Sequence, residues 1–191
     1  KIMLIYDVIA LTESGNNQYA IRFEEKVYLN IYRRKSTELL QIIQKYNECS
    51  FDTAKMIFAC SWGKYQIMGF NLYSVCQLKT SIGEFLCSDN LQNLAFLKFC
   101  IANKIDLSKV EAELKALSEQ KALIKLKTTS YAEFTESFKS FLEENQKSYQ
   151  NTITFISRYN GSKFLSDAFY SYLLRMVYNY EKLKEIGGEQ K

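Results

Sequence analysis

The chain has 191 residues, of which 47% are hydrophobic, and carries a net charge of +4 with no histidine. This length can bury the core of a single domain over residues 1–191. The lack of histidine excludes imidazole acid–base chemistry and histidine metal sites, so we expect neither a metal nor a cofactor. The positive charge is mild and evenly spread, which does not indicate a nucleic-acid partner. No run of apolar residues is long enough to predict a transmembrane segment.

The five cysteines form an odd set without a C-x-x-C pair. This spacing excludes the common zinc sites, and a disulfide framework is unusual in a chain of this size. Four of the five lie among apolar residues, which favours buried free thiols and synthesis in a reducing cytoplasm. The cysteines are Cys49, Cys60, Cys76, Cys87 and Cys100.

The composition favours a mainly α fold, because the chain has no proline and only seven glycines. Near the start, Ile2, Ile5, Ile9 and Glu13 recur at helical spacing, and Gly15 is a suitable stop. Glu13 would then lie on an apolar stripe at a helix C-terminus, where burial and the helix dipole both raise the pKa of a carboxyl group. Such a carboxyl group can serve as a general acid. Alternatively, Glu13 marks the point where the stripe reaches solvent.

Residues 16–23 have polar and β-forming character and predict a small excursion from the helices. Ser36 and Ser50 are expected to cap the next two helices. Three Ser-x-x-Glu patterns, at 81–84, 108–111 and 130–133, predict capping boxes. Between the first two, a buried helical stripe is expected from Leu91, Leu94, Leu97, Phe99 and Ile101.

Residues 107–148 predict an antiparallel helical hairpin, because two apolar stripes repeat the same spacing around a polar turn at 128–130. A last long helix is expected from about Ser166. The stripes of the hairpin are Leu107, Val110, Leu114 and Leu117, followed by Tyr131, Phe134, Phe138 and Phe141.

The most informative stretch is S-W-G-K-Y-Q-I-M-G-F-N, at residues 61–71. It holds the only tryptophan of the chain, Trp62, and two glycines, Gly63 and Gly69. A compact turn is predicted, because glycine in a plain core helix is unfavourable. The glycines either let another molecule's polar groups approach the backbone or serve a loop in an aromatic core.

This stretch resembles the S-W-G-x-F-Q-I-M-G-F-N segment of the N-acetylmuramidase family of phage endolysins, which belongs to the lysozyme-like superfamily. Three weaker blocks follow the family's order: T-E-S-G at 12–15, F-E-E-K-V-Y at 23–28 and R-Y-N-G at 158–161. The family has histidine where this chain has Lys26, and it has a shorter link in place of 107–148. We therefore interpret the hairpin as an insertion.

The resemblance implies a lysozyme-like helical catalytic domain that cleaves the β-1,4 bond between N-acetylmuramic acid and N-acetylglucosamine. It places the catalytic acid on Glu13. Glu24 matches the family's second block and is the candidate second carboxylate, although it could instead pair with Arg22. The residues that the resemblance assigns to substrate binding are Trp62, Gly63, Tyr65, Gln66, Met68, Asn71, Tyr159 and Asn160.

Two other functions stay open at this point. Without a second carboxylate in reach, the sugar's own hydroxyl could attack and give a 1,6-anhydro product, as in lytic transglycosylases. A wall-binding or partner-binding helical module is the other alternative. The expected partner is bacterial peptidoglycan, with an immunity or inhibitor protein as a further candidate. The expected place of action is the cell wall after synthesis in the cytoplasm.

Overall fold

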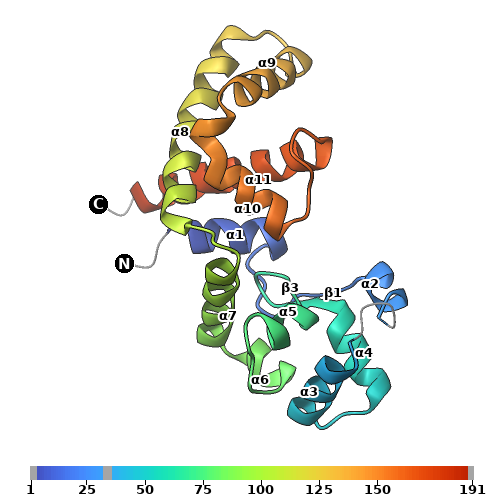
Figure 1. Cartoon of the computed structure of the whole chain (residues 1–191). Coiled ribbons are helices and arrows are strands. Elements are labelled where there is room, and N and C mark those ends of the chain that lie inside the picture. The colour runs from blue at the N-terminus through green and yellow to red at the C-terminus, as the bar shows by residue number, and fades with distance from the viewer. Residues whose placement is uncertain (1–3, 32–35, 189–191) are drawn as a thin grey trace. The chain divides into compact units, whose positions relative to one another are not determined.

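The structure is a computed structural model, which describes residues 4–31 and 36–188. These residues are mainly helical, which confirms the predicted fold class. Two compact units can be distinguished: residues 13–102 form one, and residues 1–12 with 103–191 form the other (Figure 1). The prediction that residues 1–191 make one catalytic domain stays a prediction.

The unit of residues 13–102 combines short helices with a small sheet. Its elements, in chain order, are β1 (Ile21–Phe23), α2 (Glu25–Leu29), α3 (Thr37–Asn47), α4 (Phe51–Ala59), β2 (Cys60–Trp62), β3 (Ile67–Met68), α5 (Gly69–Ser74), α6 (Ile82–Cys87) and α7 (Asp89–Ala102).

The sheet has three antiparallel strands in the order β1-β2-β3. Strand β1 falls inside the predicted excursion at 16–23, and its Phe23 pairs with Cys60 of β2. The other two strands come from the informative stretch, where Trp62 pairs with Ile67. The sequence therefore indicated a turn there, but not the strands on either side of it.

The predicted helix caps are partly confirmed. The Ser50 hydroxyl accepts a hydrogen bond from the Thr53 N–H at 3.1 Å, and Ser81 forms the full capping box with Glu84. Ser36 occupies the N-cap position of α3, but its side chain makes no cap hydrogen bond. That prediction was wrong because the Ser36 backbone does not adopt the extended conformation that directs a side chain at the helix end.

The buried face of α7 also differs from the predicted stripe. Leu94, Leu97 and Ile101 are exposed, whereas the helix buries a set that contains a glutamine: Gln92, Ala95, Phe96, Phe99 and Cys100. Helix α7 carries apolar residues on more than one of its faces, so their spacing alone did not identify the buried face. The prediction therefore also missed that Gln92 is buried.

In the second unit, every secondary-structure element of the described residues is a helix. Besides the first nine residues of α1 (Leu4–Ser14), it contains α8 (Leu107–Lys127), α9 (Tyr131–Glu144), the 3-10 helix η2 (Gln146–Tyr149), α10 (Gln150–Tyr159) and α11 (Asp167–Gly188). Ile2 of the predicted first stripe lies outside the described residues, while Ile5 and Ile9 are fully buried.

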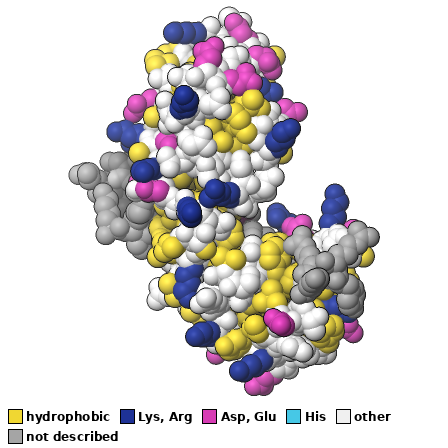
Figure 2. Space-filling model, viewed as in Figure 1, with side chains coloured by type: hydrophobic (Ala, Val, Ile, Leu, Met, Phe, Trp, Pro, Cys, Tyr) yellow, Lys and Arg dark blue, Asp and Glu magenta, His cyan; other side chains and the backbone are white. Residues whose placement is uncertain are grey.

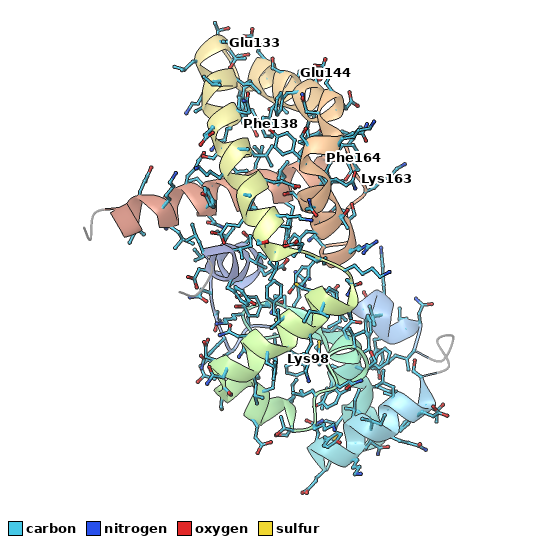
Figure 3. All side chains as sticks on the ribbon, turned by 60° about the vertical axis from the view of Figure 1, so that its left-hand side comes forward. Lys98, Glu133, Phe138, Glu144, Lys163 and Phe164 are labelled. Carbon is cyan, nitrogen blue, oxygen red and sulfur yellow. The ribbon has the colours of Figure 1, made fainter. Side chains whose placement is uncertain are left out.

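Helices α8 and α9 form the predicted pair around the turn at 128–130. The α8 stripe is buried as expected, and Phe138 lies inside the unit (Figure 3). The expected cap at Ser108 was wrong, since Asp106 accepts the backbone N–H groups of Ser108 and Lys109. Tyr131 also departs from the stripe because it is exposed.

Two buried or half-buried contacts tie the helices of this unit together. The Glu113 carboxylate of α8 accepts the backbone N–H of Thr152 at 2.7 Å and that of Asn151 at 3.2 Å. An anion at the N-terminus of α10 satisfies N–H groups that have no partner within the helix.

Helix α11 supplies the predicted apolar face: Phe169, Tyr172, Leu173, Met176 and Tyr180 are all buried.

All five cysteines are free thiols. Cys60, Cys76 and Cys100 are buried, Cys49 is half-buried and Cys87 is exposed. In the described part of the chain, no helix combines the length and apolarity needed to cross a membrane.

Candidate active site

Glu13 lies in the last turn of α1 and is half-buried. The helix ends as predicted, because Gly15 adopts the left-handed conformation at φ +65°. The neighbouring Ser14 donates its hydroxyl to the Lys64 carbonyl at 2.8 Å and accepts the Asn17 N–H at 3.1 Å. These two bonds attach the chain next to Glu13 to the turn between β2 and β3.

That turn is held by the side chain of Gln66. Its Nε2 donates to the carbonyls of Ala20, at 3.1 Å, and Gly63, at 3.0 Å. Its Oε1 accepts the hydroxyl of Ser61 at 2.9 Å. Both N–H groups of the amide are thus engaged with the protein backbone, and Gln66 itself adopts φ +50°. The geometry gives Gln66 a positioning role in the turn.

A fully buried glutamine, Gln92 of α7, is hydrogen-bonded to the turn. Its Oε1 accepts the Lys64 N–H at 2.8 Å, and its Nε2 lies 3.1 Å from the Gln18 carbonyl. The same Nε2 lies 3.3 Å from the Phe85 carbonyl and 3.2 Å from that of Leu86. One side chain therefore joins the loop after α1, the β2–β3 turn and the end of α6.

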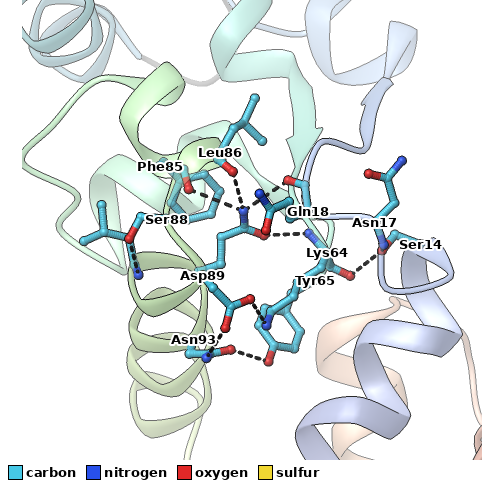
Figure 4. A network of polar contacts seen from close by, with 12 residues as sticks. Ser14, Asn17, Gln18, Lys64, Tyr65, Phe85, Leu86, Ser88, Asp89 and Asn93 are labelled. Atoms are coloured by element: carbon cyan, nitrogen blue, oxygen red, sulfur yellow. Dashed lines mark hydrogen bonds and ion pairs between the residues drawn. The ribbon is translucent and has the colours of Figure 1, made fainter.

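The buried Lys64 and Tyr65 continue this network to α7 (Figure 4). Lys64 Nζ lies 2.5 Å from Asp89 Oδ1, and the Tyr65 hydroxyl donates to Asn93 Oδ1 at 2.7 Å. The Tyr65 ring stacks on Phe96 with centroids 4.3 Å apart. Tyr65 is 1% exposed, so its ring packs under the turn and presents no face to solvent.

Trp62 and Gly69 also serve the packing of this unit. The Trp62 indole N–H donates to the Ile57 carbonyl at 2.9 Å, and the side chain is buried. A β-carbon on Gly69 would lie 1.8 Å from the same Ile57 oxygen. The group that approaches this glycine closely is therefore the protein's own backbone.

Met68 and Asn71 are half-buried at the start of α5. Met68 is the residue before the helix, and the Asn71 carbonyl accepts the N–H groups of Val75 and Cys76, both at 2.9 Å. Of the predicted binding residues in the stretch at 61–71, these two and Gln66 retain exposed surface.

Glu24 follows strand β1, and its carboxylate is paired with Arg22. Glu24 Oε1 lies 2.6 Å from Arg22 Nε, and the Glu24 side chain is 33% exposed. The Glu24 N–H donates to the Ala59 carbonyl at 3.0 Å, which fixes its backbone beside β2. Strand residues two apart point to the same face, so the ion pair occupies one face of β1.

The opposite face of β1 is apolar and exposed. Ile21 and Phe23 lie there, Tyr19 precedes them, and all three are exposed. Figure 2 shows hydrophobic side chains gathered over this part of the small sheet. Aromatic and aliphatic side chains in such a position can pack against the apolar faces of a ligand.

Tyr159 and Asn160 belong to the other unit, at the end of α10. The Tyr159 ring stacks on Phe155 at 5.0 Å between centroids. Asn160 Oδ1 accepts the hydroxyl of Ser162, and Gly161 follows at φ +77°. Their assignment to substrate binding stays a prediction from the R-Y-N-G motif.

This arrangement also contains residues that were not predicted to belong to it: Ser14, Lys64, Asp89, Gln92 and Asn93. Polar residues of these types are exposed in most helices and loops, so the burial of Lys64 and Gln92 could not be inferred from composition. The one available signal was Ser14, which follows Glu13 inside the T-E-S-G block.

No family model matches the chain, and no solved structure matches it. Over 101 residues, which are 52% of this chain and 68% of the relative, the sequence is 37% identical to the endolysin of Enterobacteria phage PRD1. On this similarity, the chain belongs to the endolysin family.

Proposed function

We propose that this protein cleaves the glycan strands of peptidoglycan at the β-1,4 bond between N-acetylmuramic acid and N-acetylglucosamine, with Glu13 as the general acid. Membership of the endolysin family supports action on the bacterial cell wall. The observation that carries the assignment is the position of Glu13, beside a residue that is hydrogen-bonded to the turn at 61–71. The lysozyme-like fold is part of the same proposal.

Glycoside cleavage requires a carboxylic acid that protonates the leaving oxygen. Glu13 is half-buried in the last turn of α1, where the helix carbonyls point toward the C-terminal end. This position at the end of α1 is the basis on which we assign the acid role to Glu13. The hydroxyl of the next residue, Ser14, makes two hydrogen bonds, to the Lys64 carbonyl and from the Asn17 N–H. These bonds hold the backbone beside Glu13 in one place.

Glu24 is the proposed second carboxylate, and its role decides the product. An inverting hydrolase needs a base carboxylate about 6.5–9.5 Å from the acid to seat a water molecule. Glu24 retains exposed surface directly after β1, and Arg22 holds its orientation. We assign Glu24 as the base that activates this water.

The pairing of Glu24 with Arg22 also favours a second candidate function. Arg22 Nε already occupies Glu24 Oε1 at 2.6 Å, so this oxygen is engaged where a water molecule would have to approach it. If Glu24 does not act as base, the substrate's own hydroxyl attacks and the enzyme is a lytic transglycosylase. The two functions differ in the product and not in the role of Glu13.

The turn residues divide between support and contact in this proposal. Trp62, Gly63 and Tyr65 form the support, since their contacts are with the protein interior. Met68 and Asn71, which are half-buried, are the proposed contacts with the sugar. Gln66 has committed both of its N–H groups, and only its carbonyl oxygen has capacity for a further bond.

Release of soluble fragments from purified peptidoglycan tests the activity. The wild type is expected to release fragments, and Glu13→Gln is expected to lose at least about 100-fold in rate because it cannot donate a proton. Asp7→Asn is the matched control, since Asp7 is exposed on the same helix and the substitution changes the charge in the same way. Equal rates for Glu13→Gln and wild type would refute the assignment.

A further inference from the structure

A groove of about 420 Å³ lies between α9 and α11. Three residues spaced four apart on α9 form one wall: Tyr131, Thr135 and Lys139. One face of α11 forms the other, and its polar and aromatic members are Asp167, Tyr170, Ser171, Arg175 and Tyr178. We call this feature the α9/α11 groove, and all its lining residues belong to one compact unit.

One end of the groove is closed by an ion pair. Lys139 Nζ lies 3.3 Å from Asp167 Oδ1 and 3.8 Å from Glu136 Oε1. The same ammonium group lies 5.2 Å from the centre of the Tyr170 ring. These contacts hold the first part of α11 against α9 and fix the width of the groove at this end.

From this end the groove extends along both helices toward two tyrosines. Lys139 and Tyr131 are eight residues apart on α9, and Asp167 and Tyr178 are eleven apart on α11. At 1.5 Å per helical residue, these separations correspond to about 12 and about 16 Å. A groove of this length accommodates a short stretch of a linear polymer and is longer than a single ion or amino acid requires.

The two tyrosines are unusually exposed for aromatic residues: Tyr131 is 76% and Tyr178 is 58% exposed. Elsewhere on α9, the aromatic residues that pack inward, Phe134 and Phe138, are buried. Helix α9 thus directs phenyl rings into the core and a phenol ring into the groove. Tyrosine combines an apolar face with a hydroxyl, which suits a ligand that has both apolar faces and hydroxyl groups.

We propose that the α9/α11 groove binds a glycan segment of peptidoglycan, as a second site that is separate from the residues assigned to cleavage. This rests on the proposed function, which supplies peptidoglycan as the substrate. Binding here retains the enzyme on an insoluble polymer between cleavage events. Avidity from a second site raises overall affinity without any new contact at the first.

The groove matches the chemistry of such a strand along its length. The Tyr131 and Tyr178 rings pack against the apolar faces of sugar rings. The hydroxyls of Thr135 and Ser171 lie between the two ends and can exchange hydrogen bonds with sugar hydroxyl and acetamido groups. Arg175 is exposed, and its guanidinium can donate hydrogen bonds to the carbonyl oxygens of the acetamido group and of the lactyl amide that joins N-acetylmuramic acid to the stem peptide.

Co-sedimentation of the full chain with purified, protein-free sacculi tests the proposal, with Glu13→Gln as the common background so that the polymer stays intact. The double variant Tyr131→Ser/Tyr178→Ser is expected to weaken binding by about tenfold or more. Arg175→Gln is expected to weaken it by about threefold to tenfold. Both changes are at exposed positions, and circular dichroism shows whether the variants stay folded.

Two matched controls separate the groove from general surface effects. Leu126→Ala removes an 83% exposed apolar side chain from α8, outside the groove. Lys163→Gln removes one positive charge from the surface of the same unit (Figure 3). Both controls are expected to bind sacculi as the background protein does. Groove variants that also bind as the background would overturn the proposal.

Treatment of the sacculi with an amidase, which removes the stem peptides, shows whether the groove binds the glycan or the peptide. Binding that survives this treatment and still depends on Tyr131 and Tyr178 supports the glycan site. Binding that is lost with the peptides overturns it in favour of peptide recognition. The sedimentation assay requires no cleavage. A wild type that releases no fragments while its binding depends on the groove therefore refutes the proposed activity and leaves the groove assignment standing.

Discussion

The side-chain oxygen of Gln92 occupies the space that a β-carbon on Gly63 would need, because the two atoms would lie only 2.4 Å apart. Gly63 also adopts φ +73°, a conformation that glycine tolerates and other residues rarely adopt. The same Gln92 oxygen accepts the Lys64 N–H at 2.8 Å. The glycine in the turn thus makes room for a buried amide of the protein itself.

Gly63→Ala is expected to destabilise the protein by about 2–4 kcal/mol, since it combines a left-handed backbone with a clash against a fully buried side chain. Urea unfolding measures the change. Gly83→Ala is the control, because a β-carbon there would meet its nearest neighbour, Ser81 Oγ, at 3.8 Å. Gly83 is the second residue of α6, and its backbone accepts alanine, so that control is expected to be neutral or to stabilise the protein by up to about 0.5–1 kcal/mol. Similar effects of the two substitutions would contradict this account of the turn.

Gln92→Leu tests the polar network directly. The substitution leaves the Lys64 N–H without its acceptor and deprives the carbonyls of Gln18, Phe85 and Leu86 of a donor. Buried polar groups without partners are costly, so we expect a loss of about 2–4 kcal/mol in the free energy of unfolding. Gln41→Leu, at an exposed position on α3, is expected to change it by less than about 0.5 kcal/mol. A neutral Gln92→Leu would show that the network contributes little.

Glu24→Gln tests the second carboxylate. If Glu24 activates water, the substitution lowers turnover by about 100-fold or more, whereas the loss of a pair that is partly exposed to solvent costs at most about 1 kcal/mol of stability. Glu25→Gln, at the exposed neighbouring position, is expected to keep full turnover. Steady-state release of fragments measures both. Unchanged turnover in Glu24→Gln would identify the enzyme as one that needs no base carboxylate at this position.

Stability is expected to decrease at alkaline pH. Burial raises the pKa of the Cys76 and Cys100 thiols from 9.0 to about 12, and burial likewise raises the pKa of Tyr73 from 10.0 to about 12. Between these limits the unfolded chain releases protons that the folded chain retains, so the free energy of unfolding falls as the pH rises from about 9 toward about 12.

Urea midpoints at a series of pH values measure this decrease. Cys76→Ala removes one of the buried thiols and is expected to make the decrease shallower. Cys87→Ala removes an exposed thiol and is expected to leave it unchanged. A midpoint that stays constant across this alkaline range would contradict the burial of these groups.

Local signals in the sequence predicted the helices well. The spacing of Ile5, Ile9 and Glu13, followed by Gly15, located the end of α1 to within a residue. Ser81 with Glu84 marked the start of α6 by a mechanism that acts within one turn. The helices of 107–127 and 131–144 followed from their apolar spacing. These features depend on residues that are close together in the chain.

Features that depend on distant residues were missed. The sheet needs β1 to meet β2 from 39 residues away, as in the pairing of Arg22 with Ser61, and β3 has only two residues. The burial of Gln92 depends on three carbonyls from two other segments. Trp62 and Tyr65 were candidates for sugar contacts because exposure cannot be read from residue type, and in the structure both are buried.

Mass spectrometry of the fragments released from purified peptidoglycan, by the wild type and by Glu13→Gln in parallel, tests the central claim most directly. The account predicts fragments with reducing N-acetylmuramic acid ends from the wild type and none above background from Glu13→Gln. Fragments with 1,6-anhydro ends would keep Glu13 as the acid and contradict the role given to Glu24. Fragments with the same ends and in the same yield from both proteins would contradict the assignment of Glu13.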